Sequence, residues 1–241
     1  MQLTAANGQT QDLTIDLQTV EALSRHELQR QTTTPRFEFD GISPGEALNV
    51  LAGYYAARVR GRDHDVTWDA DTVSHLKEMA LYMTDSGDSR NGLMMAGTVG
   101  NGKSTLMWAL ARAIEYLDST TGAFAYLTDP RSMYTEHPRL TILGAREIAM
   151  MVKEPEKFEK IKRTHYLGID DLGTDPTEVM DYGELKTPLV ELIEYRYERR
   201  LFTVITTNLL PDQIEAKYGS RIRDRLREMC LKISFGQNSY R

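Results

Sequence analysis

A glycine-rich stretch, "AGTVGNGKST", holds the residues of this sequence with the clearest chemical potential. Gly97, Gly102, Lys103 and Ser104 fit the spacing GxxxxGK[ST] between an apolar run and a helix-like run. Glycines let backbone N–H groups turn toward phosphate oxygens, and the following helix adds its positive dipole end. Lys103 would reach the β- and γ-phosphates, and Ser104 would bind Mg²⁺. The pattern predicts a phosphate-binding loop that comprises Gly97, Thr98, Val99, Gly100, Asn101, Gly102, Lys103, Ser104 and Thr105.

Two carboxylates follow a second apolar run in "YLGIDDLG". The carboxyl ends of parallel strands form the ligand-binding edge of a sheet, so these side chains are expected beside the phosphate loop. Asp170 suits the Mg²⁺ shell, and Asp171 is placed to orient or deprotonate an attacking water. The alternative interpretation is a pair of solvated aspartates in a turn.

A third polar group ends the run "VITTN". At the same sheet edge, the Asn208 amide would hold the catalytic water and contact the γ-phosphate without adding charge. Asn is also a common helix N-cap, and Pro211 follows shortly, so a purely structural role is the competing interpretation.

Apolar and amphipathic segments alternate along the rest of the chain. This alternation predicts an α/β fold with a parallel sheet. The expected strands are 93–97, 140–144, 166–170, 202–208 and 231–235. The expected helices are 17–31, 44–60, 68–86, 103–117, a charged stretch ending near 163, 183–200 and 211–228.

Composition narrows the class of protein. The 241 residues carry a formal net charge of −6, and no apolar run approaches the roughly 20 residues that cross a bilayer. The start has no basic and apolar export signal, and one cysteine, Cys230, builds no disulfide framework. The five histidines have no ligand spacing, which argues against a structural metal site. We therefore expect a cytoplasmic protein without membrane contact.

The motifs together resemble the AAA+ ATPases of the DnaC/DnaI helicase-loader and IstB type. The resemblance rests on "GTVGNGKST", "GIDDLG", "RYERRLFTVITTN" and "YGSRIRDRL…ISFGQNSYR", in that order. It implies a P-loop NTPase (AAA+/ASCE) three-layer sandwich with strand order 5-1-4-3-2 and no C-terminal helical lid. It implies an AAA+ domain over 66–241, preceded by a short helical or partly disordered segment, 1–65, with a possible partner-binding role.

The resemblance also assigns roles to residues and partners. "GIDDLG" and "TTN" take the Walker B and sensor 1 positions. Arg221 is similar to the arginine finger that reaches a neighbouring subunit's nucleotide, Arg225 to a second arginine of that helix, and Arg241 to sensor 2. The implied protein is a Mg²⁺-dependent ATPase that forms homo-oligomers on single-stranded DNA and loads a replicative helicase. The alternative is an IstB-like ATPase that assists a transposase.

The sequence also allows a third functional interpretation and contains two segments whose role it does not define. A small-molecule kinase with a basic lid is a third interpretation, although no acceptor motif is visible. The stretch 153–163, "KEPEKFEKIKR", would contribute to DNA binding or form a solvated helix face. Residues 118–138 look like an insertion without a legible purpose.

Overall fold

The computed structural model describes residues 2–4, 10–12, 16–30, 39, 41–84, 90–121 and 138–236. The chain divides into two compact units, Met1–Thr33 and Thr34–Arg241. In the first unit, β1 (Gln2–Thr4) pairs antiparallel with β2 (Thr10–Asp12). Helix α1 (Leu17–Arg30) begins after Asp16, whose carboxylate accepts a hydrogen bond from the Gln18 amide at 3.0 Å. Arg241 lies outside the described residues.

The second unit is built on five parallel strands. They are β3 (Gly92–Gly97), β4 (Thr141–Gly144), β5 (Tyr166–Leu172), β8 (Phe202–Thr207) and β9 (Cys230–Phe235). Their order across the sheet is β9-β3-β8-β5-β4, and each neighbouring pair is parallel. When these five strands are counted along the chain, the order is 5-1-4-3-2. The predicted α/β class and strand order are confirmed.

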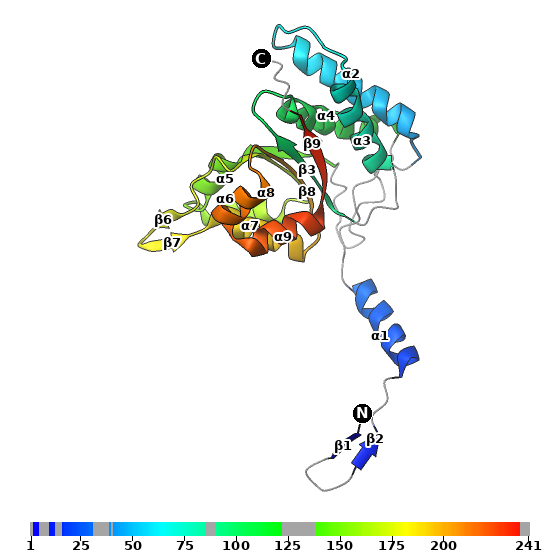
Figure 1. The fold of residues 1–241 in the computed structure, drawn as a ribbon, viewed down its shortest axis with the longest axis vertical. Coiled ribbons are helices and arrows are strands. Elements are labelled where there is room, and N and C mark those ends of the chain that lie inside the picture. The colour runs from blue at the N-terminus through cyan, green and yellow to red at the C-terminus, as the bar shows by residue number, and fades with distance from the viewer. Residues whose placement is uncertain are drawn as a thin grey trace. The chain divides into compact units, whose positions relative to one another are not determined.

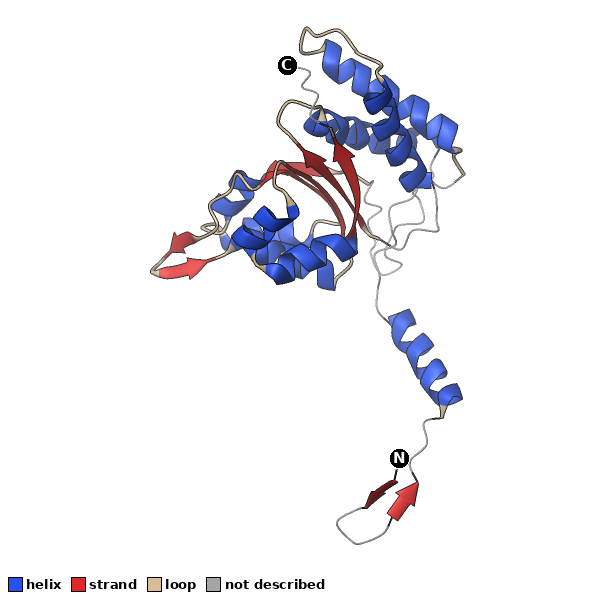
Figure 2. Cartoon of the chain, in the orientation of Figure 1, coloured by secondary structure: helices blue, strands red, loops and turns tan. Residues whose placement is uncertain are grey.

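Helices cover both faces of the sheet (Figures 1 and 2). One face carries α2 (Pro44–Arg60), α3 (Ala70–Thr84) and α4 (Lys103–Thr121). The other carries α5 (Ala145–Met151), α6 (Pro155–Arg163), α7 (Pro188–Glu198), α8 (Pro211–Tyr218) and α9 (Ser220–Met229). Successive residues of a strand point to opposite faces, so Leu93 and Met95 join one apolar cluster and Met94 joins the other. This is a three-layer sandwich.

Helix α2 belongs to the second unit, and not to a separate N-terminal segment. We expected a boundary at residue 65, but the compact units divide at Thr33/Thr34. Leu51 and Tyr55 of α2 lie in the same buried cluster as Leu106 of α4. The start of α2 is fixed by a capping box, in which Ser43 and Glu46 bond each other's backbone N–H groups. Burial of its apolar face explains the difference from the expected boundary.

Two expected helices differ from the observed elements. The helix expected over 183–200 begins at Pro188, and a hairpin of β6 (Val179–Asp181) and β7 (Glu184–Lys186) precedes it. Tyr182 and Gly183 both have positive φ, which makes a hairpin turn there. The helix expected over 211–228 is broken at Gly219, where φ is 89°. Helix α4 extends to Thr121, and residues 122–137 of the expected insertion lie outside the described part of the chain.

Candidate nucleotide site

The glycine-rich loop connects β3 to α4, as the motif requires. A Cβ atom on Gly97 would lie 2.4 Å from the Phe235 carbonyl oxygen, so only glycine fits against β9 at this point. Gly102 has a φ of 90°, a conformation that other residues rarely adopt. The loop therefore depends on its glycines for close approach and for backbone geometry.

Lys103 is folded back onto this loop. Its ammonium donates to the carbonyl oxygens of Gly97 at 2.8 Å and Thr98 at 2.6 Å, and to Asn101 Oδ1 at 2.9 Å. An ammonium has three donors, so all three are used. Burial lowers the pKa of Lys103, while the charges of Asp171 and Asp170 oppose that shift. A phosphate oxygen would replace one or more of these neutral acceptors.

Ser104 meets Asp170 across the gap between α4 and β5. The Ser104 hydroxyl donates to Asp170 Oδ1 at 2.8 Å, which joins two residues that are 66 positions apart in the chain. Adjacent ligands of an octahedral Mg²⁺ lie about 2.9 Å apart, because the ligand distances are about 2.0–2.1 Å. The two oxygens thus already have the chemistry and the spacing of two Mg²⁺ ligands.

Asp171 sits on a β-bulge. The pairing of β5 with β8 shifts register between Ile169 and Leu172, and Asp171 has a φ of 56°. Its side chain is exposed, unlike that of Ile169. Bulges often redirect a side chain beside an active site. Here the bulge separates the orientation of Asp171 from that of Asp170.

Asn208 follows the last residue of β8 and does not cap the next helix. The N-cap position of α8 is Leu210, whose amide donates to Gln213 Oε1 at 2.8 Å. The Asn208 side-chain oxygen is buried and has no hydrogen-bond partner among the described residues. A buried amide oxygen without a partner is costly, so this group is available to a ligand or water.

The arginines of α9 differ in their surroundings. Arg225 is buried, lies 2.8 Å from both Glu194 and Glu198, and covers the Tyr197 ring. It anchors α9 to α7. The Arg221 side chain is 72% exposed, with a 3.3 Å contact to Glu194. Arg221 is therefore largely exposed to solvent, whereas Arg225 is engaged within its own chain.

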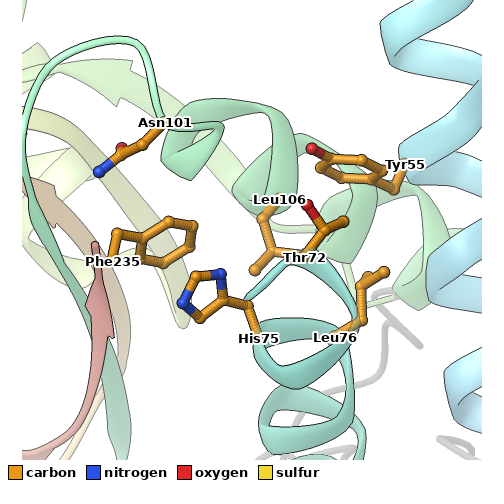
Figure 3. A pocket seen from close by; sticks show the side chains of 7 residues that line it. All are labelled: Tyr55, Thr72, His75, Leu76, Asn101, Leu106 and Phe235. Carbon is orange, nitrogen blue, oxygen red and sulfur yellow. The ribbon is translucent and has the colours of Figure 1, made fainter. Parts of the chain in front are cut away.

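A small pocket lies beside the glycine-rich loop (Figure 3). Its walls come from α2, α3, α4, the loop and β9, and the lining residues are Tyr55, Thr72, His75, Leu76, Asn101, Leu106 and Phe235. The His75 ring stacks on Phe235 with centroids 3.9 Å apart. Thr98 and Asn101 both donate to the Gly236 carbonyl oxygen, at 3.3 and 3.2 Å. The loop is thereby tied to the residue that follows β9.

Three groups at this sheet edge were not anticipated from the sequence. Thr206 bonds both aspartates through one hydroxyl. Lys217 donates to the Gly173 and Asp175 carbonyl oxygens at 2.7 and 2.5 Å, and the Tyr218 hydroxyl bonds the Asp175 carboxylate. Lys217 and Tyr218 hold the loop after β5 against α8. Thr206 lies inside the quoted "VITTN", but no sequence signal marks the other two.

Helix α6 covers residues 155–163 of the basic stretch 153–163, and the exposure of the cations in it varies. Lys162 is buried between Glu159 and Glu191, at 2.7 and 2.6 Å, so it supports α6 and α7. Lys157 and Arg163 are exposed and pair with neighbouring glutamates. Within the described residues there is no cluster of three acidic, histidine or cysteine ligands, and no helix long and apolar enough for a membrane.

Comparison with known proteins places the fold. No family model matches the sequence, and no curated protein matches it. The crystal structure of the DnaC helicase loader is similar, with a TM-score of 0.51 and 17% identity over 71% of this chain and 93% of that one. A protein assigned as a primosome component of Streptococcus pyogenes serotype M3 has a TM-score of 0.53 and 18% identity over 87% and 97%. At these identities the likeness shows the fold alone, which this chain shares with the DnaC helicase loader and the primosome component.

Proposed function

We propose that this chain is a Mg²⁺-dependent ATPase that loads a replicative helicase on single-stranded DNA. The observation that carries the ATPase part is the contact of Ser104 with Asp170 beside the buried Lys103. This contact supports the proposal, because a hydroxyl and a carboxylate oxygen 2.8 Å apart can serve as two ligands of one cation. The fold of DnaC-type loaders supports the same class of protein.

Each residue at the sheet edge has a separate task in hydrolysis. Lys103 would exchange loop carbonyls for β- and γ-phosphate oxygens, and Ser104 and Asp170 would hold Mg²⁺, which would supply positive charge next to the phosphates. Asp171 accepts the proton of the attacking water, and Asn208 orients that water through its unpaired side-chain oxygen.

The exposure of Arg221 supports a proposed assembly into head-to-tail oligomers. Arg221 is exposed on α9 and would meet the nucleotide of a neighbouring copy. Contacts of this head-to-tail kind generate rings or spirals, which present a repeated basic strip to single-stranded DNA. The exposed cations of α6, Lys157 and Arg163, are our candidates for that strip. Arg225 supports α9 from within, and Arg241 remains a proposed sensor of the nucleotide.

The N-terminal segment is the proposed partner-binding part. Val20 and Leu23 of α1 are 49% and 63% exposed, which leaves apolar surface for a partner.

Capture by the immobilised full chain, with ATP and single-stranded DNA, should retain a replicative helicase. Retention of a transposase instead would favour the IstB-like alternative. Deletion of residues 1–33 should abolish capture and leave ATP binding intact.

Nucleotide binding is tested with a matched pair of lysine variants. Lys103→Ala removes the cation that meets the phosphates, so ATP binding should be lost. Lys157→Ala removes an exposed cation on α6 and should bind ATP as the wild type does. Calorimetric titration with a non-hydrolysable ATP analogue measures both. Equal affinity in Lys103→Ala and wild type would show that the loop is not a phosphate site.

A further inference from the structure

Thr206 joins the two aspartates of the site through a single hydroxyl. The hydroxyl donates to Asp170 Oδ1 at 2.5 Å and accepts from the Asp171 backbone N–H at 2.8 Å. Thr206 has no exposed surface, so water does not compete for these bonds. A hydroxyl has one donor and two acceptor sites, and here the only donor is spent on the carboxylate.

The bulge in β5 explains why Thr206 contacts both aspartates. Ile169 pairs with Ile205 and Leu172 with Thr207, so Asp170 and Asp171 together face the one remaining residue of β8, which is Thr206. A bulge disrupts the regular ladder and leaves an extra residue to be held by other means. Asp171 also has a left-handed backbone, with a φ of 56°, that a non-glycine residue adopts at a cost. The Thr206 hydroxyl satisfies its N–H group in that conformation.

Mg²⁺ binding would leave the bond from Thr206 to Asp170 in place. In the present structure Asp170 Oδ1 accepts from both Ser104 and Thr206. A hydroxyl that binds a cation turns its lone pair to the metal, so Ser104 would release its hydrogen bond to the carboxylate. The Thr206 bond needs no such change. Partners that orient a metal-binding carboxylate control its direction and its affinity for the metal.

We propose that Thr206 is a positioning residue of the Mg²⁺ and water site. It fixes the rotamer of Asp170 for the cation and the backbone of Asp171 for the proton transfer, without touching the substrate. This inference rests on the proposed ATPase function. It adds a residue that acts on both carboxylates at once.

The test compares three isosteric or conservative variants of β8. Thr206→Val removes the hydroxyl and keeps the shape, and Thr206→Ser keeps the hydroxyl. The matched control is Thr207→Val, because Thr207 is equally buried but bonds the Leu172 carbonyl oxygen at 2.7 Å and the Leu209 amide at 3.1 Å. Both valine variants lose one buried hydroxyl from the same strand. A general loss of stability should therefore affect them alike.

Three quantities are measured for each protein: the ADP dissociation constant in excess chelator, the Mg²⁺ concentration for half-maximal turnover, and kcat and KM for ATP. Thr206→Val should bind metal-free ADP within about 2-fold of wild type, since Lys103 and the loop are unchanged. Its half-saturating Mg²⁺ should rise, and its kcat should fall, by about 10-fold or more. Thr206→Ser should stay within about 3-fold of wild type, and so should Thr207→Val.

The results distinguish a failure of the positioning role of Thr206 from a failure of the proposed ATPase function. Wild-type Mg²⁺ dependence and kcat in Thr206→Val, or equal defects in the two valine variants, would overturn the positioning role and leave the ATPase function standing. A wild-type protein that binds no nucleotide would overturn the ATPase function, and the positioning role with it.

Discussion

The substitution Arg196→Met tests what stabilises the starts of β5 and β8, at the end of the sheet opposite to the candidate site. Arg196 of α7 is completely buried. Its guanidinium donates to the carbonyl oxygens of Thr164 and Phe202, both at 2.6 Å, and to Thr203 Oγ1 at 2.8 Å. Longer bonds of 3.3 Å reach the carbonyl oxygens of Lys162 and His165. Burial lowers the pKa of Arg196 to about 9, so the side chain still carries its proton at neutral pH.

The expected decrease in the free energy of unfolding follows from the acceptors that lose the guanidinium. Methionine fills much of the same volume but donates nothing, so the Thr164 and Phe202 carbonyl oxygens and Thr203 Oγ1 each lose one short hydrogen bond in a buried place. At about 1–1.5 kcal/mol for each, the loss is about 3–4.5 kcal/mol. The relief of a buried charge offsets part of it, yet removing one member of a buried charged network typically costs about 3–5 kcal/mol. We therefore expect the free energy of unfolding to fall by about 3 kcal/mol.

Urea unfolding measures this change directly. The transition midpoint should shift while the slope stays constant, and the thermal midpoint should fall by about 6–12 °C. The matched control is Arg199→Met, because Arg199 ends the same helix but is exposed and lies over the Tyr195 ring. It should lose less than about 1 kcal/mol. A loss below about 1 kcal/mol in Arg196→Met would refute the reasoning, since the five bonds would then have no net value.

Two further predictions concern other parts of the chain. Cys230, the single cysteine, is buried, and burial raises its pKa to about 12, so a thiol reagent at about pH 8 should label the unfolded protein and not the native one. Rapid labelling without denaturant would contradict the packing of β9 against β3. Arg221→Ala should abolish ATP-dependent assembly in light scattering, while ATP affinity persists. Arg227→Ala, an equally exposed arginine of the same helix, is the control and should assemble normally. Loss of assembly in both variants would indicate a general charge effect on α9.

Local patterns predicted the sheet and the glycine-rich loop between β3 and α4 because their causes are local. Glycine spacing, a buried strand and the next helix occupy one short stretch, so "AGTVGNGKST" predicts its own geometry. The strand order came from the resemblance, and the pairing of the five strands agrees with it. Pro44 behind Ser43 predicted the start of α2 for the same local reason.

The remaining features depend on contacts between distant residues. Thr206 and Asp170 are 36 positions apart, and only the bulge in β5 makes them meet. The apolar face of α2 is visible in the sequence, but the sequence does not say that it packs on α4. The hairpin before α7 contains Val179, Met180 and Leu185, whose spacing does not distinguish a short strand pair from a helix.

Turnover of ATP by Asp171→Asn is the measurement that tests the central claim most directly. The amide keeps the shape of the side chain but accepts no proton, so ATP binding should persist while turnover falls by roughly 10²-fold or more. Glu178→Gln, an exposed carboxylate a few residues further along, should hydrolyse ATP like the wild type. Hydrolysis by Asp171→Asn at the wild-type rate, under saturating Mg²⁺ and ATP, would contradict the account of this sheet edge as an ATPase site.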